Sequence, residues 1–301
     1  MTVWLSSLVA ILLRFALRGL VLSSFLFSST VLSAGLDDVV ITIKSDNTGS
    51  SSDVQFTLPT TGSGYNYNID CNNDGTDEAT AQTADYTCDY TSLGGAGTYT
   101  VRIEDNSGVR TGFSRIFFNN GGDKLKIIDI SQWGTGSWTS MLNAFFGAEN
   151  MTVTAVDVPS FSGLSDVSGM FLNAALVNPN TSAWDTSSVT NMSNMFSGAT
   201  SASPDTSSWN TSNVISMAAM FRGAVAANPN TSNWDVSNVS DMSSLFRDAV
   251  SANPDTSSWD TSSVNQMWYM FAGAISATPD TSSWNTGLVT SMESMFQGAS
   301  S

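Results

Sequence analysis

The 301-residue chain carries 26 acidic and 10 basic side chains and therefore a net charge of −16 at neutral pH. Because nucleic-acid phosphates require clustered lysine and arginine, this balance excludes nucleic acid as a partner. The sequence contains no histidine, which excludes serine- and cysteine-dependent catalysis with a histidine base and zinc sites with histidine ligands.

The N-terminal residues 1–34 have the pattern of an export segment. Arg14 and Arg18 precede an apolar stretch at 20–32, and small residues suited to signal cleavage follow it. A second apolar run at 3–13 lies ahead of the arginines, so an uncleaved N-terminal anchor is the alternative to a cleaved signal peptide. Either form predicts a protein that is secreted or held at the cell surface, with membrane contact only through this segment if it stays uncleaved.

Residues 35–119 carry a β pattern of short β-branched or aromatic runs between turn residues. We expect strands at 39–43, 54–58, 65–69, 99–103 and 115–118. Several short strands at this spacing predict a small all-β sandwich.

Parts of this segment resemble the PKD module and related immunoglobulin-like modules of bacterial surface proteins. The resemblance rests on the run 65–70, the turn Asp74-Gly75-Thr76 and the run Gly97-Thr98-Tyr99-Thr100-Val101. The Trp-x-Phe-Gly-Asp-Gly core of that module is absent, so the match is partial. It implies a PKD/immunoglobulin-like sandwich at 35–119.

Cys71 and Cys88 are the only two cysteines of the chain. An even count in an exported protein predicts a disulfide between them. A loop of this length gives a stabilisation of about 3 kcal/mol in the chain-entropy model. A catalytic or redox role is not expected, because the sequence has no Cys-x-x-Cys motif.

The same region contains a candidate calcium loop. Asp70, Asn72, Asp74 and Gly75 match positions 1, 3, 5 and 6 of an EF-hand-type loop, and Glu78 falls at position 9. The bidentate carboxylate of position 12 is missing. We therefore keep two hypotheses: a Ca²⁺ site with ligands Asp70, Asn72, Asp74 and Glu78, or an Asp/Asn-rich turn stapled by the disulfide. No other cofactor is expected.

A strict 25-residue period marks residues 120–301. It is visible in the phenylalanines Phe171, Phe196, Phe221, Phe246, Phe271 and Phe296, and in the tryptophans Trp184, Trp209, Trp234, Trp259 and Trp284. Such a period predicts a stacked-repeat solenoid whose first repeats are degenerate. Ahead of it, residues 125–130 have a strand pattern. The chain stops just past a repeat, so we expect that further repeats or an anchor follow.

Each repeat combines a turn, a strand-like run and an apolar pattern of helical spacing. In one copy 256–259 supplies the strand, and Met267, Met270, Phe271 and Ala274 fall at i, i+3, i+4 and i+7. Glycines such as Gly273 are expected to end the helix with a left-handed residue. The pattern predicts an α/β leucine-rich-repeat-like solenoid with one short strand and one short helix per coil.

The repeat unit Trp-Asp-x-Ser-x-Val-x-x-Met-x-x-Met-Phe-x-x-Ala, with Trp234 to Met242 as one example, is similar to that of BspA-family leucine-rich-repeat surface proteins, whose 25-residue repeats are of the DUF285 type. The resemblance covers residues 120–301. It implies a secreted or surface-attached bacterial protein with a non-enzymatic role in adhesion.

The Trp, Met, Phe and Val columns are expected to form the core, because burying each such side chain contributes about 1.5–3 kcal/mol. Two further columns mix Asp with Asn: Asn180, Asp205, Asn230, Asp255 and Asp280, and Asp185, Asn210, Asp235, Asp260 and Asn285. We expect these side chains to bond turn backbone. A calcium-binding stripe is the alternative.

The repeat departs from its own pattern at Trp268-Tyr269, where other copies have Ser193-Asn194 or Ala218-Ala219. These positions lie off the core phase, so an exposed aromatic pair is expected there as a contact for a partner. Packing against a neighbouring loop or protomer is the alternative. Arg222 and Arg247, one repeat apart in one column, are candidates for an added cationic contact.

The sequence thus predicts a non-enzymatic surface protein that binds an extracellular protein or glycan through its repeats. A structural surface-layer or spacer protein is the second hypothesis. A calcium-dependent glycan binder or a secreted hydrolase is the third.

Overall fold

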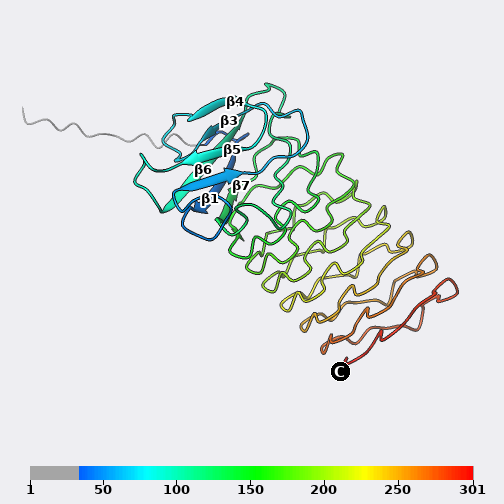
Figure 1. Ribbon diagram of the computed structural model, residues 1–301. Coiled ribbons are helices and arrows are strands. Elements are labelled where there is room, and N and C mark those ends of the chain that lie inside the picture. Colours follow the sequence, from blue (N-terminus) through cyan, green and yellow to red (C-terminus); the bar gives the residue numbers. More distant parts are fainter. Residues whose placement is uncertain (1–33, 301) are drawn as a thin grey trace, which may run out of the picture. The chain divides into compact units, whose positions relative to one another are not determined.

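The structure, a computed structural model, describes residues 34–300, and its strands occupy the N-terminal part of that range (Figure 1). They are β1 (Val39–Lys44), β2 (Gln55–Leu58), β3 (Tyr67–Asp70), β4 (Ala79–Gln82), β5 (Tyr86–Asp89), β6 (Thr98–Asp105), β7 (Ile127–Gln132) and β8 (Thr152–Val153). Within residues 34–300 there is no helix, and hence no helix long and apolar enough to cross a membrane. The predicted export segment lies outside the described range except for its last residue.

Six strands form one mixed sheet in the order β4-β3-β6-β1-β7-β8, and β2 and β5 form a second, two-stranded sheet. All pairings are antiparallel except β7 with β8. β1 lies between β6 and β7, and its alternate residues Ile41 and Ile43 are fully buried. The strand pattern therefore forms a half-buried sheet, as period-two alternation requires.

The predicted immunoglobulin/PKD-like sandwich at 35–119 is corrected by these pairings. The sheet extends past residue 119, because β7 pairs with β1 and β8 pairs with β7. The expected strand at 115–118 is absent, and β4, β5 and β8 were not predicted. Phe118 N–H instead donates to the carbonyl oxygen of Ala144, so this run leads into the repeats rather than into a sheet.

Beyond β8 the chain forms stacked 25-residue coils, drawn from green to red in Figure 1. Single parallel bridges join them, as between Asn191 and Ser216 or Ser216 and Asp241. The phenylalanine rings stack from coil to coil with centroids 5.6–5.8 Å apart, and all but the last of these rings are buried. The predicted core columns are confirmed, and one hydrophobic core runs from the sheets through the coils.

The predicted α/β leucine-rich-repeat solenoid is wrong, because no coil contains a helix or a regular strand. The backbone is left-handed at every fourth residue of the segment expected to be helical, with φ 55° at Tyr269 and 72° at Gly273. Each such residue ends a turn, so N–H groups bond three residues back, as Met270 does to Met267, instead of four. Four-residue turns give Met267 and Phe271 the same spacing as a helical face, which explains the wrong prediction.

The hydrogen bonds between coils in this segment have one direction. Alternate residues make them, as in the bonds from the N–H groups of Met192, Asn194, Phe196 and Gly198 to the carbonyl oxygens of Ser216, Ala218, Met220 and Arg222. The following described coils repeat the pattern up to Gly273, which donates to Gln297. In this segment the N–H groups therefore point toward the next coil and the bonded carbonyls toward the previous one.

The two Asp/Asn columns form turns, as predicted. In each coil the side-chain Oδ1 accepts a hydrogen bond from the N–H two residues on, for example Asp205 from Ser207 at 3.0 Å and Asn180 from Ser182 at 3.2 Å. Asp and Asn make the same bond, since both offer a carbonyl-type oxygen. The mixed column therefore keeps one turn geometry while limiting the number of stacked negative charges.

Candidate functional site

Trp268 and Tyr269 lie together at the surface of one coil. Their rings meet edge to face with centroids 5.9 Å apart. Trp268 is 37 % exposed, although most tryptophans of the repeats are buried in the core, and Tyr269 is half-buried. Exposed aromatic side chains that hold each other in place are suited to anchoring a partner.

Tyr269 sits in a left-handed backbone conformation that a bulky side chain seldom adopts. The equivalent residues are Asn194, Ala219, Ser244 and Ser294, and their φ angles of 51–57° match the 55° of Tyr269. The fold thus imposes this conformation in every coil, and Asn meets it with less strain than Tyr. The aromatic ring is retained here against a backbone preference.

Arg247 completes the cluster. Its guanidinium Cζ lies 4.7 Å from the centroid of the Tyr269 ring, and its Nε lies 3.4 Å from Oδ2 of Asp248. The structure therefore brings three of the four predicted partner-binding residues into contact with one another: Trp268, Tyr269 and Arg247. The cation over the ring orients the aromatic face and leaves Trp268 the more accessible of the pair.

Arg222, the fourth predicted residue, lies one coil before Arg247 and is exposed. It borders a hollow of about 440 Å³ that spans several coils. The other lining residues are Leu172, Asn173, Asn194, Ser197, Gly198, Gly223 and Asp248. The structure thus divides the predicted contact residues between an aromatic cluster and a polar hollow, with Asp248 common to both.

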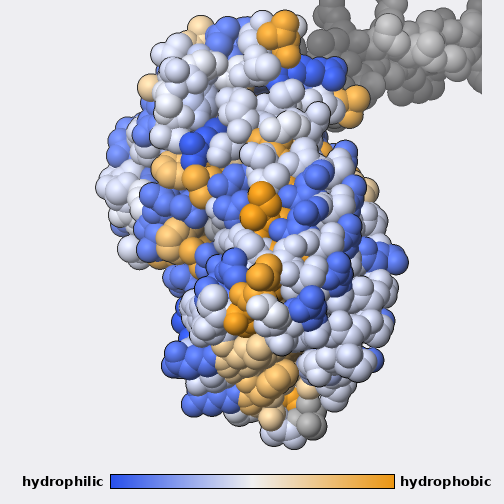
Figure 2. Space-filling model, turned by 90° about the vertical axis from the view of Figure 1, so that its right-hand side faces the viewer, coloured by the Kyte–Doolittle hydropathy of each residue, from blue (hydrophilic) through white to orange (hydrophobic). Residues whose placement is uncertain are grey.

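Apolar side chains are also exposed elsewhere on the coils, including Leu176, Ile215, Val225 and Ile275. On the face of the molecule in Figure 2, apolar side chains lie among polar ones and gather toward the lower middle of the view. The aromatic cluster is therefore one of several exposed apolar features of these coils.

The four candidate calcium ligands are engaged within their own turn. Asp70 accepts N–H groups of Asn72, Asp74 and Gly75, and its Oδ2 lies 3.5 Å from Nη2 of Arg102. Glu78 Oε2 accepts the N–H of Cys71 at 2.5 Å. These contacts are those of the Asp/Asn-rich turn, and among residues 34–300 no cluster of three or more acidic, histidine or cysteine side chains is suited to a metal. The calcium site stays a prediction.

The pKa values of this loop follow its contacts. Burial raises the pKa of Glu78 above its usual range even though the Cys71 N–H opposes the shift. The Asn72 side chain and the Thr76 N–H lower the pKa of Asp74. Burial lowers the pKa of Arg102, but the carboxylates of Asp38, Asp70 and Asp77 outweigh it and raise the value. Arg102, in β6, is therefore a permanent cation beside the loop.

Cys71 and Cys88 form the predicted disulfide, with Cα atoms 5.7 Å apart. Cys71 follows β3 of the six-stranded sheet and Cys88 lies in β5 of the two-stranded sheet. Both side chains are buried. The bond therefore joins the two sheets, and no free cysteine is found in the sequence that the structure covers.

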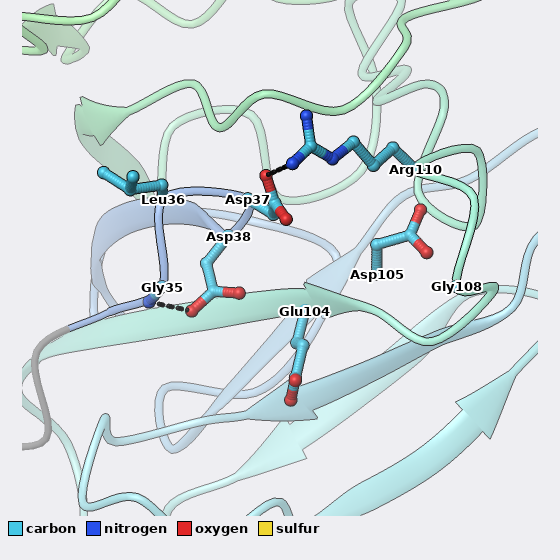
Figure 3. Close-up of a pocket in the computed structure, with 8 residues that line it drawn as sticks. All are labelled: Gly35, Leu36, Asp37, Asp38, Glu104, Asp105, Gly108 and Arg110. Carbon is cyan, nitrogen blue, oxygen red and sulfur yellow. Dashed lines mark hydrogen bonds and ion pairs between the residues drawn. The ribbon is translucent and has the colours of Figure 1, made fainter.

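A second hollow, of about 400 Å³, lies beside the start of β1 and the end of β6 (Figure 3). Asp37, Asp38, Glu104 and Asp105 surround it together with Arg110. The Asp37 carboxylate pairs with Arg110 at 3.3 Å, and Asp38 accepts the Gly35 N–H at 2.7 Å (Figure 3). Its carboxylates thus already have partners within the chain.

The environments of two of these carboxylates differ. Burial raises the pKa of Asp38 despite the nearby Arg102, whereas bonds from Ser107 and Gly112 outweigh burial and lower the pKa of Asp105. Opposite shifts are what a hydrolytic acid–base pair needs. The Asp38 side chain is only 5 % exposed, however, and it pairs with Arg102 at 3.4 Å.

A comparison with protein families matches residues 111–234 and 216–301 to DUF285, described as a Mycoplasma protein of unknown function. The chain belongs to the DUF285 family. The searches of curated proteins and of solved structures returned no match. The DUF285 match supports the sequence-based assignment to a repeat family, whereas no comparison supports a PKD or immunoglobulin-like module.

The DUF285 region contains the aromatic cluster, both arginines of the repeats and the hollow that Arg222 borders. The disulfide, the candidate calcium loop and the acidic hollow all lie before it. The two sets of candidates thus belong to different parts of the chain.

The residues that line the polar hollow beside Arg222 were not predicted from the sequence. Asn173, Asn194 and Asp248 belong to ordinary repeat columns, and nothing in their composition marks them. One signal was present: Asp248 replaces the glycine found at the equivalent positions of Gly198, Gly223 and Gly273. The Asp248 side chain borders the hollow, whereas the glycines at this position of the neighbouring coils contribute no side chain.

Proposed function

We propose that this protein is a secreted or cell-surface bacterial binding protein that acts in adhesion without catalysis. Its coils present Trp268, Tyr269 and Arg247 to an extracellular protein or glycan. The similarity of the 25-residue repeats to those of BspA-family surface proteins supports this role. The Cys71–Cys88 disulfide supports an oxidising extracytoplasmic location.

The observation that carries the proposal is the conformation of Tyr269. A left-handed backbone costs an L-residue with a side chain about 1–2 kcal/mol, and the bulk of Tyr brings no compensating burial in the core. Its φ of 55° recurs in the same column at Asn194, where an amide suits it better. Strain retained at a half-buried aromatic that packs on the exposed Trp268 supports a role in contact rather than in folding.

The absence of catalysis is supported by two observations. The sequence has no histidine, and the carboxylates around the acidic hollow are held by Arg102, Arg110 and backbone N–H groups. A structural spacer is the competing function. It would need stacked coils but no exposed aromatic cluster.

The experiment compares the double variant Trp268→Ala with Tyr269→Ala against the parent on arrays of extracellular matrix proteins and glycans. The variant reproduces Ala218-Ala219 of another coil, so we expect it to fold. Loss of a central aromatic anchor should weaken binding by about tenfold or more. The matched control, Ser243→Ala with Ser244→Ala, makes the same change at the equivalent positions of another coil, where no aromatic is lost and no lining residue of the hollow is touched, and should bind like the parent.

Equal binding by the aromatic double variant and the parent would contradict the role of the cluster. No binding by the parent to any surface, with intact folding, would favour the spacer function instead.

A further inference from the structure

The polar hollow beside Arg222 exists because two adjacent coils lack a side chain in one column. The column runs through Asn173, Gly198, Gly223, Asp248, Gly273 and Gly298, all of which have positive φ. A Cβ placed on Gly198 would lie 2.2 Å from Oδ1 of Asn173, and one on Gly273 would lie 2.4 Å from Oδ1 of Asp248. Asn173 and Asp248 therefore each cover the glycine of the next coil.

Gly223 differs from Gly198 and Gly273 in what lies over it. The nearest atoms to a Cβ placed there are backbone atoms of Gly198, at 3.8 Å, and no side chain covers it. The hollow of about 440 Å³ thus opens over Gly223, with Asn173 at one end and Asp248 at the other. The floor is backbone, and the walls are polar side chains.

The side chains that line the hollow offer both hydrogen-bond donors and hydrogen-bond acceptors. Asn173 and Asn194 each carry an amide that donates and accepts, and Asp248 accepts. Leu172 is the one large apolar residue of the lining. Because few apolar groups line the hollow, an apolar protein side chain would bury little surface here. Sugar hydroxyls both donate and accept hydrogen bonds and therefore match these groups.

The charged side chains near the hollow restrict the class of ligand further. Arg222 and Arg247 are the only basic residues between 127 and 301, and the hollow lies beside Arg222. Arg247 already contacts Asp248 and the Tyr269 ring. Arg222 is exposed and makes no ion pair within residues 34–300, so its guanidinium is free to accept an anionic group. Guanidinium and carboxylate are well matched in geometry.

We propose that this hollow binds a carboxylate-bearing oligosaccharide. Arg222 pairs with the sugar carboxylate, and Asn173, Asn194 and Asp248 bond hydroxyl groups. The overall charge of −16 favours a ligand with few carboxylates over a polyanion. The inference rests on the proposed function as an extracellular binding protein and specifies one ligand class and its site.

The test fills the hollow in one variant and removes its cation in another. Gly223→Asn places a side chain over the floor, at φ 68°, and the same column already holds Asn173 at φ 56°. Gly298→Asn is the matched control, since its φ is 71° and a Cβ there lies 3.9 Å from the nearest atom, outside the hollow. Arg222→Gln removes the cation and keeps a polar side chain.

The full chain and these variants are titrated calorimetrically with 3′-sialyllactose and digalacturonate, and with the carboxyl methyl esters of both, which keep the sugar rings and are neutral. We expect at least one acidic sugar to bind about tenfold more tightly than its neutral counterpart, because hydrogen bonds between charged partners are stronger than those between neutral ones. Gly223→Asn and Arg222→Gln should each lose that binding about tenfold, while Gly298→Asn keeps it.

Three outcomes would overturn the inference: no binding of either acidic sugar, equal binding of acidic and neutral sugars, or unchanged binding by Gly223→Asn. The proposed function is tested separately by the Trp268→Ala with Tyr269→Ala variant. Capture of a matrix protein that depends on the aromatic pair, without any acidic-sugar binding, would leave the proposed function standing and the ligand assignment wrong.

Discussion

The guanidinium of Arg247 lies over the ring of Tyr269, with 4.7 Å between Cζ and the ring centroid. The two residues come from neighbouring coils, so the contact also holds one coil against the next. Arg222, one coil earlier, has no such ring beneath it because Ser244 occupies the position of Tyr269.

We therefore expect Arg247→Ala to lower the free energy of unfolding by about 0.5–1 kcal/mol, the range for an exposed cation–π contact. Urea unfolding followed by tryptophan fluorescence measures it. Arg222→Ala is the control and should change stability by less than half as much. Equal effects of the two substitutions would mean that the ring contact contributes nothing.

Tyr269→Asn should raise stability and lower binding. Asn accepts the left-handed backbone, which relieves about 1 kcal/mol of strain, while the lost ring contact offsets part of that gain. Ala219→Asn, in the same column at φ 53°, should stabilise without affecting binding. A clear loss of stability in Tyr269→Asn would show that the ring is there for packing.

Phe221→Ala should be among the most destabilising substitutions. Its ring is fully buried and stacks on Phe196 and Phe246, each at 5.8 Å, so truncation leaves a cavity at the centre of the stack. The expected cost is about 3–5 kcal/mol in urea or thermal unfolding. Phe296 stacks on Phe271 alone and is 46 % exposed, so Phe296→Ala should cost less than half of that.

Much of this core was predictable from the sequence. The 25-residue phase identified the Phe, Met and Trp columns as buried, and the Asp/Asn columns as turn residues. The helix was not distinguishable from four-residue turns, because both place Met267 and Phe271 on one side. The left-handed backbone at Tyr269 and Gly273 distinguishes the turns from a helix. In the sequence only a glycine indicates such a backbone, so Tyr269 gave no sign of it.

The hollow over Gly223 was harder still to predict. It depends on where the side chains of Asn173 and Asp248 lie relative to the next coil, which is a property of the stacking rather than of any single repeat. The strands β4 and β5 were missed because Ala79–Gln82 and Tyr86–Asp89 lack a run of β-branched residues. The disulfide, by contrast, followed from the cysteine count alone.

Reduction of the Cys71–Cys88 disulfide should lower stability by about 3 kcal/mol, the chain-entropy value for such a loop. Because the bond joins β5 to the end of β3, the loss should concentrate in the two sheets. Hydrogen exchange with and without reductant measures this. Protection of amides in the coils around Phe221 serves as the internal control and should persist.

Acidification should weaken the coils. Bonds from Ser257 lower the pKa of Asp255 below its usual 3.8, and Ser207, Ser262 and Ser282 act similarly on Asp205, Asp260 and Asp280. A lowered folded-state pKa gives stability that is full above about pH 4 and is lost as the pH falls through the folded value. The raised pKa values of Asp38, Asp77 and Glu78 act in the opposite direction.

Asp255→Asn separates these contributions. The amide oxygen still accepts the Ser257 N–H, as Asn230 does from Ser232 at 3.2 Å, but it does not titrate in this range. We expect unchanged stability at pH 7 and a smaller loss between pH 4 and pH 2 than in the parent, measured by thermal unfolding. An identical acid profile would show that the column aspartates do not govern it.

The hydrogen bonding between coils repeats in one register, and this has a consequence for how such chains evolve. From Met192 through Gly273 alternate N–H groups bond to the next coil, and at another position of each coil an N–H group, such as that of Ile215 to Thr190, bonds back to the previous one. A duplicated 25-residue unit inserted between any two of these coils therefore meets the same pair of complementary edges as its parent. The array can gain or lose whole units without any new interface having to arise, and a unit that carries an aromatic pair can be moved along it intact.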